Sequence, residues 1–170
     1  MKRSVSLAGV LIGVALAIAL PGRSPAAGND RAQIMMLYTN FAVAFERKDL
    51  DGVMASYVRD NSLFVFDASP PREFDGWASY RADYKGFFDL CKGPLREKIS
   101  EVGVTVYGDV AYSHVIAEIS GSLKKGGTFD AVLRVTDVLR KLNGKWVIVQ
   151  EHLSVPVDLF TGKADLKSKQ

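Results

Sequence analysis

Hydrophobic residues in segment 30–47 recur with the spacing of one face of an α-helix. The apolar positions that carry this spacing are Ile34, Leu37, Tyr38, Phe41, Ala44 and Phe45. Residues three and four apart lie on the same face of a helix, so the pattern predicts a helix over 30–47 with Asp30 as its N-cap.

Two further helices are predicted before the chain changes character. Segment 50–57 follows Asp49, a residue type favoured at helix N-caps. Segment 77–90 follows Asp75-Gly76 and is rich in tyrosine and phenylalanine. A short apolar strand over 63–67 lies between these helices, and Ser69-Pro70-Pro71 ends it.

The C-terminal half alternates apolar and polar residues with the period of a β-strand. Strands are predicted over 98–107, 110–123, 128–142 and 145–155, and each boundary carries glycine. The last turn is Asn143-Gly144, the dipeptide most typical of a tight hairpin. Helices followed by an antiparallel meander predict an α+β domain with three N-terminal helices packed on a curved sheet of four long strands and one short one.

The first 26 residues have the pattern of a secretory signal peptide. Lys2 and Arg3 precede an uncharged apolar run over 5–20, and small residues follow it. A retained membrane anchor is the alternative, but the apolar run is shorter than the roughly 20 residues that a membrane span needs. We expect cleavage near residue 26, a secreted or periplasmic product and no stable membrane anchor.

The charge and the cysteine content bear on the partners of the protein and on how its fold is stabilised. The chain has net charge +3, but residues 1–26 hold three basic residues and no acidic one, so the remainder is neutral. The basic pI is therefore no evidence for a nucleic-acid partner. Cys91 is the single cysteine, which rules out an intramolecular disulfide, and we expect it to be buried within the third helical segment.

Asp137 is the most informative polar residue in the predicted strands. In strand 128–142 it shares a face with Leu133, Val135 and Leu139, whereas Arg134 alternates with them. An ionised carboxylate is costly to bury, so an inward-facing Asp137 would be chemically significant. Pairing with a neighbouring arginine or lysine remains the structural alternative.

Strand 145–155 also carries polar residues between apolar ones. Strict alternation places Val147, Val149, Glu151 and Leu153 on the inner face. The opposite face then carries Trp146, Ile148, Gln150, His152 and Ser154. This second face is mixed in character, as is typical of a dimer surface.

Three segments resemble the superfamily of nuclear transport factor 2, ketosteroid isomerase and SnoaL-like proteins. They are Phe45–Tyr57 (FERKDLDGVMASY), Asp75–Tyr80 (DGWASY) and the closing hairpin from Thr136 to Pro156. The resemblance implies a SnoaL-like domain over 30–159, followed by a disordered polar tail over 160–170. It also implies a cone-shaped pocket and a homodimer formed through the outer face of the sheet.

The resemblance to ketosteroid isomerases implies two catalytic carboxyl groups. Asp137, in the sequence Asp-Val-Leu-Arg, matches the protonated acid of their oxyanion hole, and Asp67 resembles their general base. The oxyanion tyrosine of those enzymes falls on Phe41, which has no hydroxyl; Tyr38 lies one turn away, and Tyr57 matches another pocket tyrosine. Asp67 could also be a loop or helix-cap residue.

Together these observations predict a pocket for a small, mostly apolar molecule. The expected lining residues are Tyr38, Phe41, Tyr57, Phe66, Tyr84, Phe88, Leu133, Val135, Val149, Glu151 and Leu153. No cofactor and no metal are expected, because His114 and His152 have no metal-site spacing. Two functions stay open: proton transfer of the isomerase or dehydratase type, and a non-catalytic dimerisation or ligand-binding module.

Overall fold

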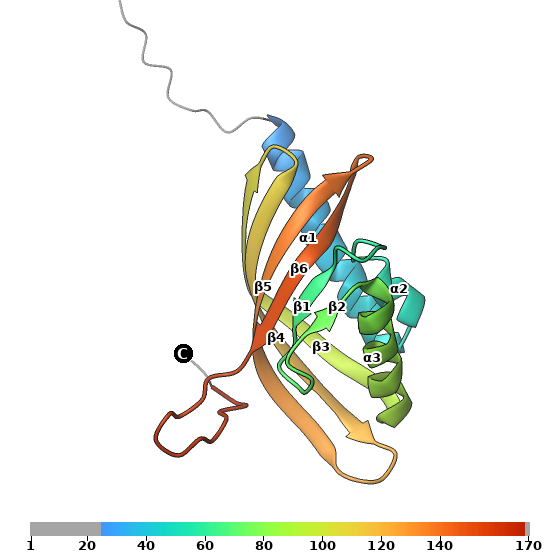
Figure 1. The fold of residues 1–170 in the computed structure, drawn as a ribbon, viewed down its shortest axis with the longest axis vertical. Helices are drawn as coiled ribbons and strands as arrows, with labels where there is room; N and C mark the ends of the chain where they lie inside the picture. The colour runs from blue at the N-terminus through green and yellow to red at the C-terminus, as the bar shows by residue number, and fades with distance from the viewer. Residues whose placement is uncertain (1–24, 169–170) are drawn as a thin grey trace, which may run out of the picture.

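A curved six-stranded sheet and three helices make up the computed structural model, which describes residues 25–168 (Figure 1). Almost all of the predicted signal peptide therefore lies outside the described residues. The helices are α1 (Pro25–Arg47), α2 (Leu50–Met54) and α3 (Trp77–Leu90). The strands are β1 (Phe64–Phe66), β2 (Phe74–Asp75), β3 (Cys91–Tyr107), β4 (Val110–Leu123), β5 (Thr128–Leu142) and β6 (Lys145–Ser154).

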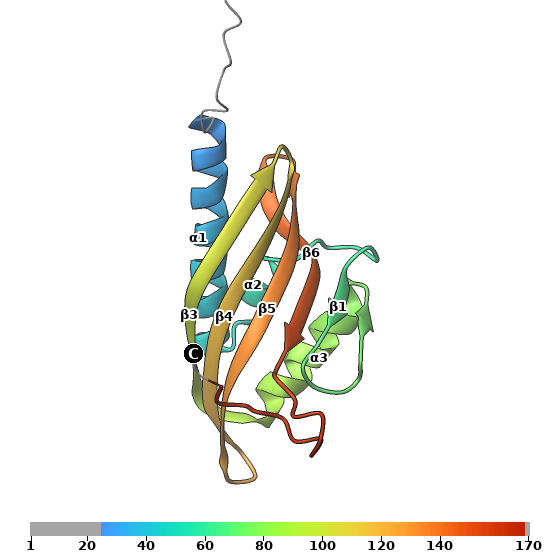
Figure 2. The ribbon, with the colours of Figure 1, turned by 90° about the vertical axis from the view of Figure 1, so that its left-hand side faces the viewer.

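The sheet has the order β2-β1-β6-β5-β4-β3, and only the β1–β6 pair is parallel. Helix α1 runs along the sheet beside β3, and α3 lies across the open side of the curve (Figure 2). The helices thus cover one face only, as the α+β prediction requires. Within residues 25–168, no helix is long and apolar enough to cross a membrane.

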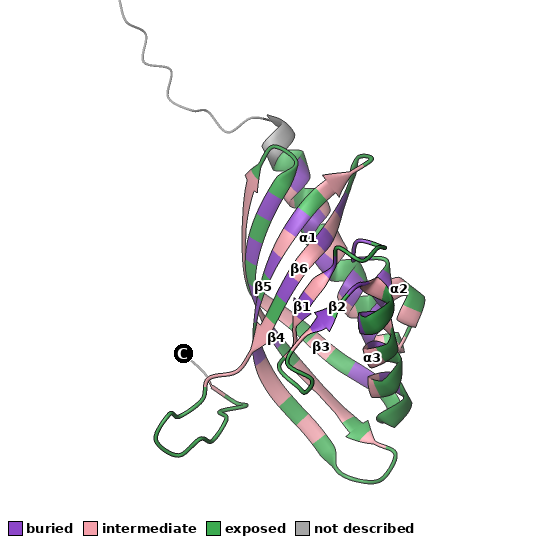
Figure 3. Ribbon diagram, viewed as in Figure 1, coloured by how far each residue is buried: buried purple, intermediate pink, exposed green. Residues whose placement is uncertain are grey.

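Burial alternates along the central strands, as Figure 3 shows for β4 and β5. The four residues predicted to face inward from β5 are all buried, and Arg134 between them is exposed. The inner face of β5 is therefore confirmed. Leu133, Val135 and Leu139 of this face belong to the hydrophobic core.

Helix α1 begins earlier than predicted, which changes the role of Asp30. Asp30 lies within α1 and not at its N-cap, and its side chain is buried. Asp30 Oδ1 accepts hydrogen bonds from Lys141 Nζ at 2.6 Å and Trp146 Nε1 at 3.1 Å, and these bonds lower the pKa of Asp30. Asp30 thus ties α1 to the β5–β6 hairpin.

The other two helices agree with the sequence pattern. Asp49 caps α2 by accepting a hydrogen bond from the Gly52 backbone N–H at 3.0 Å. Helix α2 stops at Met54, three residues before the predicted end, and Tyr57 then bridges to Ile148 of β6. Helix α3 has the predicted bounds and starts after Gly76, whose φ is 80°.

Strand β3 starts seven residues before the predicted boundary of 98, and Cys91 is its first residue. The thiol is buried as expected, but in a strand instead of a helix. Pro94 obscured this start, because proline cannot donate to a sheet ladder. Here the pairing with β4 is interrupted between Lys92 and Arg96, so Pro94 occupies a stretch where no donor is needed.

A β-bulge in β6 overturns the strict alternation expected for that strand. Val138 pairs with Gln150 but Leu139 pairs with Ile148, so Val149 is an extra residue. One inserted residue moves every side chain beyond it to the other face. Trp146 and Ile148 are consequently buried, contrary to prediction, while Val149 is only partly buried.

The C-terminal segment predicted to be disordered from residue 160 is described as far as Ser168, is exposed over residues 160–167, and contacts the sheet only near its end. The Val132 backbone N–H donates to the Leu166 carbonyl at 2.8 Å. Lys167 forms an ion pair with Asp130 at 3.0 Å. The segment thus returns to β5 after leaving β6.

Replacing Asp30 with alanine is expected to lower the free energy of unfolding by about 1–2 kcal/mol, because the buried Trp146 indole N–H loses its acceptor. Urea unfolding measures this change. Asp75→Ala is the control, since Asp75 is exposed on β2, and its effect should stay within about 0.5 kcal/mol. Equal losses in the two variants would contradict a structural role for Asp30.

Candidate functional site

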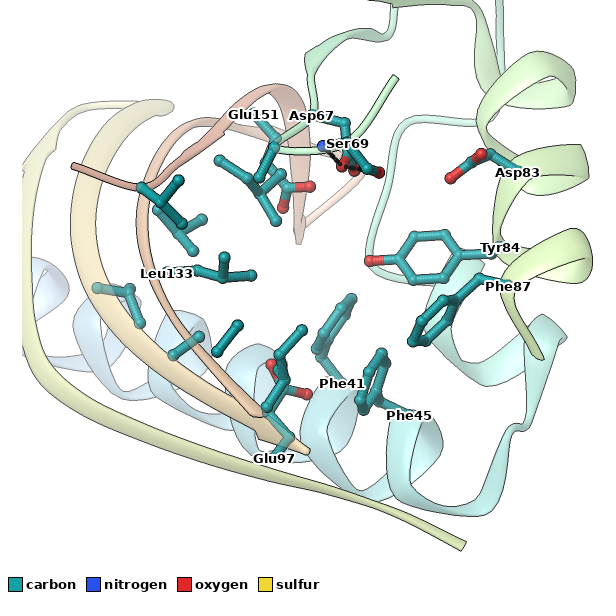
Figure 4. Close-up of a pocket in the computed structure, with 18 of the residues that line it drawn as sticks. Phe41, Phe45, Asp67, Ser69, Asp83, Tyr84, Phe87, Glu97, Leu133 and Glu151 are labelled. Carbon is teal, nitrogen blue, oxygen red and sulfur yellow. Dashed lines mark hydrogen bonds between the residues drawn. The ribbon is translucent and has the colours of Figure 1, made fainter. Parts of the chain in front are cut away.

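A cavity of about 850 Å³ lies between the concave face of the sheet and helices α1 and α3 (Figure 4). Aromatic rings from the two helices line one side, among them Phe41, Phe45, Tyr84 and Phe87. Small and branched aliphatic side chains of β3 to β6 line the other. Pro70 and Leu90 are exposed and also line the cavity, so it opens to solvent there.

Asp137 lies in the wall of this cavity and has no exposed surface. Tyr38 donates a hydrogen bond from its hydroxyl to Asp137 Oδ2 at 2.5 Å, and Ser113 Oγ lies 3.4 Å from the same oxygen. The hydroxyls of Tyr38 and Ser113 are also hydrogen-bonded to each other. Asp137 Oδ1 has no hydrogen-bond partner within the described part of the chain.

Glu151 is the second buried carboxyl group, and it is the cross-strand partner of Asp137 in the β5–β6 ladder. Tyr57 donates its hydroxyl to both carboxylate oxygens, at 3.1 and 3.0 Å. Tyr80 donates to Oε1 at 2.8 Å. Phenols from α1, from α3 and from the segment after α2 therefore hold two adjacent acids of the sheet.

Burial raises the pKa of the Asp137 carboxyl to about 6, against hydrogen bonding with Tyr38, Glu151 and Ser113, which lowers it. Burial, and then the charge of Asp137, also raises the pKa of Glu151 well above its ordinary value. Two adjacent buried carboxylates repel each other, so they titrate as a pair. The pair therefore holds its first proton more firmly than an isolated exposed carboxyl group would.

Asp67 lies just beyond β1, at the cavity lining and half-buried. Parallel pairing sets Val65 opposite Glu151, and this pairing brings the end of β1 to the acid pair. Asp67 Oδ1 accepts hydrogen bonds from Ser69 N and Oγ, at 2.9 and 2.8 Å. Its Oδ2 lies 3.4 Å from the Tyr80 hydroxyl, so Tyr80 stands between Asp67 and Glu151.

Nine of the sequence-predicted site residues line the cavity: Tyr38, Phe41, Asp67, Tyr84, Leu133, Val135, Asp137, Glu151 and Leu153. Tyr57 is fully buried behind the wall, where it holds Glu151. Phe88 packs into the core against Phe45. Phe66 points the other way and contacts His152, and Val149 is displaced by the bulge, so these four do not form the lining.

The resemblance to ketosteroid isomerases implies a hydroxyl at the position of Phe41, and in this structure a different residue supplies it. Tyr38, one turn earlier on α1, supplies a phenol at Asp137. Ser113, Tyr80 and Glu97 belong to the site but were not predicted. The alternation of Ser113 with Ala111 and Val115 marks an inner face and could have revealed it. Glu97 precedes residue 98, where its strand was predicted to start, so the alternation of inner and outer positions could not assign it to a face.

No three histidine, cysteine, aspartate or glutamate side chains of the described segment are grouped to hold a metal ion. His114 and His152 are both exposed on the outer face of the sheet. The chemistry available in the cavity is therefore that of carboxyl and phenol groups.

A family model described as a SnoaL-like domain matches residues 34–158. The chain belongs to the SnoaL-like family. No curated protein matches it. The matched range begins within α1 and extends past the end of β6, and it includes the whole cavity wall contributed by the sheet.

Solved structures share the fold. A nuclear transport factor 2-like protein of unknown function from Pseudomonas putida has 26% identity and TM-score 0.75, covering 84% of this chain and 98% of its own. A ketosteroid isomerase-like protein from Erwinia carotovora has 23% identity and TM-score 0.61, covering 72% and 93%. A proposed scytalone dehydratase from Novosphingobium aromaticivorans has 13% identity and TM-score 0.69, covering 84% and 90%.

The raised pKa values predict that stability falls as the pH rises. Asp137 changes from an ordinary pKa of 3.8 to about 6, and Glu97 from 4.5 to about 8. A group with a higher pKa in the folded protein binds more protons when folded, so the free energy of unfolding decreases between the two values. We expect urea unfolding to show a steady loss of stability from pH 5 to pH 8.

Glu97→Gln should reduce the slope of this loss above pH 6, because the interval between the ordinary pKa of Glu97 and its pKa in the folded protein extends to about pH 8. At pH 8 the variant should exceed the wild type by about 2 kcal/mol, a value discounted for the partial exposure of the side chain. Glu118→Gln, on the exposed face of β4, is the matched control. The same slope in wild type and Glu97→Gln would contradict the assignment.

Proposed function

We propose that this SnoaL-like domain binds a small, largely apolar molecule in its cavity and transfers a proton on it. The observation that carries the proposal is Asp137, which has no exposed surface, lines the cavity and holds an unpartnered Oδ1. A buried polar atom without a partner costs free energy. A ligand group that reaches Asp137 would remove this cost.

The lining supports binding of an apolar molecule. A volume of about 850 Å³ lies within the range of roughly 300–1,000 Å³ that is usual for small-molecule sites. Phe41, Tyr84 and Leu133 face the cavity in Figure 4 and present apolar surface. Each 100 Å² of apolar ligand surface removed from water contributes about 2.5 kcal/mol before the costs of association.

The carboxyl groups support proton transfer next to a carbonyl. In this proposal Asp67 takes the proton from a carbon beside the carbonyl of the ligand. The C–H electron pair forms a carbon–carbon double bond, and the carbonyl π electrons move to oxygen. The Asp137–Glu151 pair, in which burial raises both pKa values and so favours the protonated form, donates a hydrogen bond to that oxygen.

Two outcomes follow from the same enolate intermediate. If the ligand has a carbon–carbon double bond next to the deprotonated carbon, Asp67 returns the proton to the far carbon of that double bond, and a conjugated isomer forms. If the next carbon carries a hydroxyl, the electron pair of the enolate forms a double bond to that carbon as its C–O bond breaks, and the hydroxyl leaves as water with the proton of Asp67. Tyr80 contacts both Asp67 and Glu151 and positions the base relative to the acid. The names of the isomerase-like and dehydratase relatives are consistent with this chemistry.

We further propose that the protein is exported and forms a homodimer through the outer face of its sheet. The leader-like sequence of residues 1–26 supports export. The exposed His152, Thr136 and Tyr112 on β6, β5 and β4 support the choice of face. Sedimentation analysis of the mature protein measures the oligomeric state.

Deuterium exchange into cyclic ketones tests the proton transfer without knowledge of the natural substrate. We expect the protein to accelerate exchange beside the carbonyl for a subset of a size-graded ketone panel in D₂O, measured by mass spectrometry. Asp67→Asn and Asp137→Asn should each slow the accelerated exchange by about 100-fold or more, because each removes one partner of the acid–base pair.

Asp75→Asn is the control, because it removes an exposed carboxylate outside the cavity. It should retain the wild-type rate, and all variants should share the wild-type melting temperature to within a few degrees. Undiminished exchange in both site variants contradicts the assigned residues. Ketone binding without any exchange in the wild type would instead identify a non-catalytic binding module.

A further inference from the structure

Among the described residues that line the cavity, the side chains of the acidic and basic residue types are all carboxyl groups. These groups are Asp67, Asp83, Glu97, Asp137 and Glu151. No arginine, lysine or histidine occurs among the described residues of the lining. The proton-transfer site accounts for three of the acids and leaves Glu97 and Asp83 without a role.

Glu97 lies on β3, and in Figure 4 its side chain points into the cavity from the side opposite Asp67 and Glu151. Its Oε2 is buried and has no hydrogen-bond partner in the described structure. Glu46 of α1 stands beside it and accepts a hydrogen bond from the Glu97 backbone N–H at 3.4 Å. A second carboxylate therefore lies close to an already unpartnered one.

No cation of the described chain neutralises this position. None of the ion pairs between residues 25 and 168 includes Glu97 or Glu46. The titratable groups that face Glu97 are Glu46 from α1 and Tyr84 from α3, and its partner on β4 is Ile119. The surroundings of Glu97 thus supply negative charge and apolar surface.

A buried acid in such surroundings is either protonated or paired with a cation from elsewhere. Burial, and then the charge of Glu46, raises the pKa of Glu97 to about 8. An ammonium group supplies three N–H donors and a positive charge, whereas a ligand carboxylate or phosphate would be repelled by every charged group of the lining.

The cavity contains a second, independent sign of a ligand. Asp137 is completely buried in the same cavity, and its Oδ1 is also without a partner. In the sheet register Glu97 pairs with Ile119, which pairs with Ala131, and Asp137 lies further along β5 by about 20 Å of strand. The two unpartnered oxygens are therefore at separate ends of one apolar space.

We propose that the ligand of this cavity is an amine: an elongated apolar body whose protonated amino group binds Glu97. The inference rests on the proposed binding function and adds the chemical class and the orientation of the ligand. The apolar body lies against Phe41, Phe45 and Phe87, and the other end reaches the Asp137–Glu151 pair. Glu46 strengthens the attraction without facing the ligand directly.

Three fluorescent probes with one skeleton test this inference: pyrenebutylamine, pyrenebutanol and pyrenebutanoate. We expect the amine to bind at least about tenfold more tightly than the alcohol, because it gains a charge-assisted bond to Glu97. The butanoate should bind most weakly. Glu97→Gln should bring the amine-to-alcohol ratio close to one, whereas Glu118→Gln on the outer face should retain the wild-type ratio.

Proton release gives a second readout that a loss of packing would not change. At pH 7 Glu97 is mostly protonated, so amine binding should release close to one proton, measured by calorimetry in buffers of different ionisation enthalpy. The affinity for the amine should rise with pH and level off above pH 8. The alcohol should release no proton in either protein.

An amine that binds no more tightly than the alcohol would overturn the inference while leaving the proposed binding of apolar molecules intact. An amine preference that persists in Glu97→Gln would also overturn it. Failure of all three probes to bind would contradict the proposed function itself, and the inference with it.

Discussion

The adjacent carboxyl groups of Asp137 and Glu151 impose the main constraint on this structure. They are cross-strand partners in the middle of the sheet, and neither has appreciable contact with solvent. A pair of acids is tolerated in such a place only when hydrogen-bond donors surround it. Those donors are the phenols of Tyr38 on α1, Tyr80 on α3 and Tyr57 in the segment after α2, so polar bonds attach α1 and α3 to the centre of the sheet.

This attachment explains why the cavity stays open above the acid pair. The phenols of Tyr38 and Tyr80 approach from α1 and α3 at one end, and aromatic side chains such as Phe45 and Phe87 pack on each other at the other end. The curved sheet between these two contacts carries small side chains, including Ala117 and Ala131, that do not fill the concavity. The cavity thus follows from residue size on the sheet and from the two points where the helices touch.

The sequence predicted the layer arrangement, most strand boundaries and the inner face of β5, because these depend on local periodicity. The prediction of strand faces failed where a single residue changes the alternation of inner and outer positions. Val149 adds one residue to β6, and alternation therefore placed Trp146 and Ile148 on the wrong face. Pro94 hid the start of β3, and with it the position of Glu97. Bulges and interrupted ladders are set by the neighbouring strand, which a local pattern does not contain.

The site was predictable to the same extent. Asp137 and Glu151 were predicted from the alternation of inner and outer positions along their strands, because a lone acid on an apolar strand face is conspicuous. The phenols that hold them come from three separate segments, and no spacing in the sequence relates Tyr38 to Tyr80. Their convergence is a property of the fold. It also has a physical consequence: hydrogen bonds from the phenols lower the pKa values of Asp137 and Glu151, which burial raises, so the two effects oppose each other. Glu97 has no phenol bonded to it, and its Oε2 has no partner among the described residues; a ligand that brings its own donor would satisfy that oxygen.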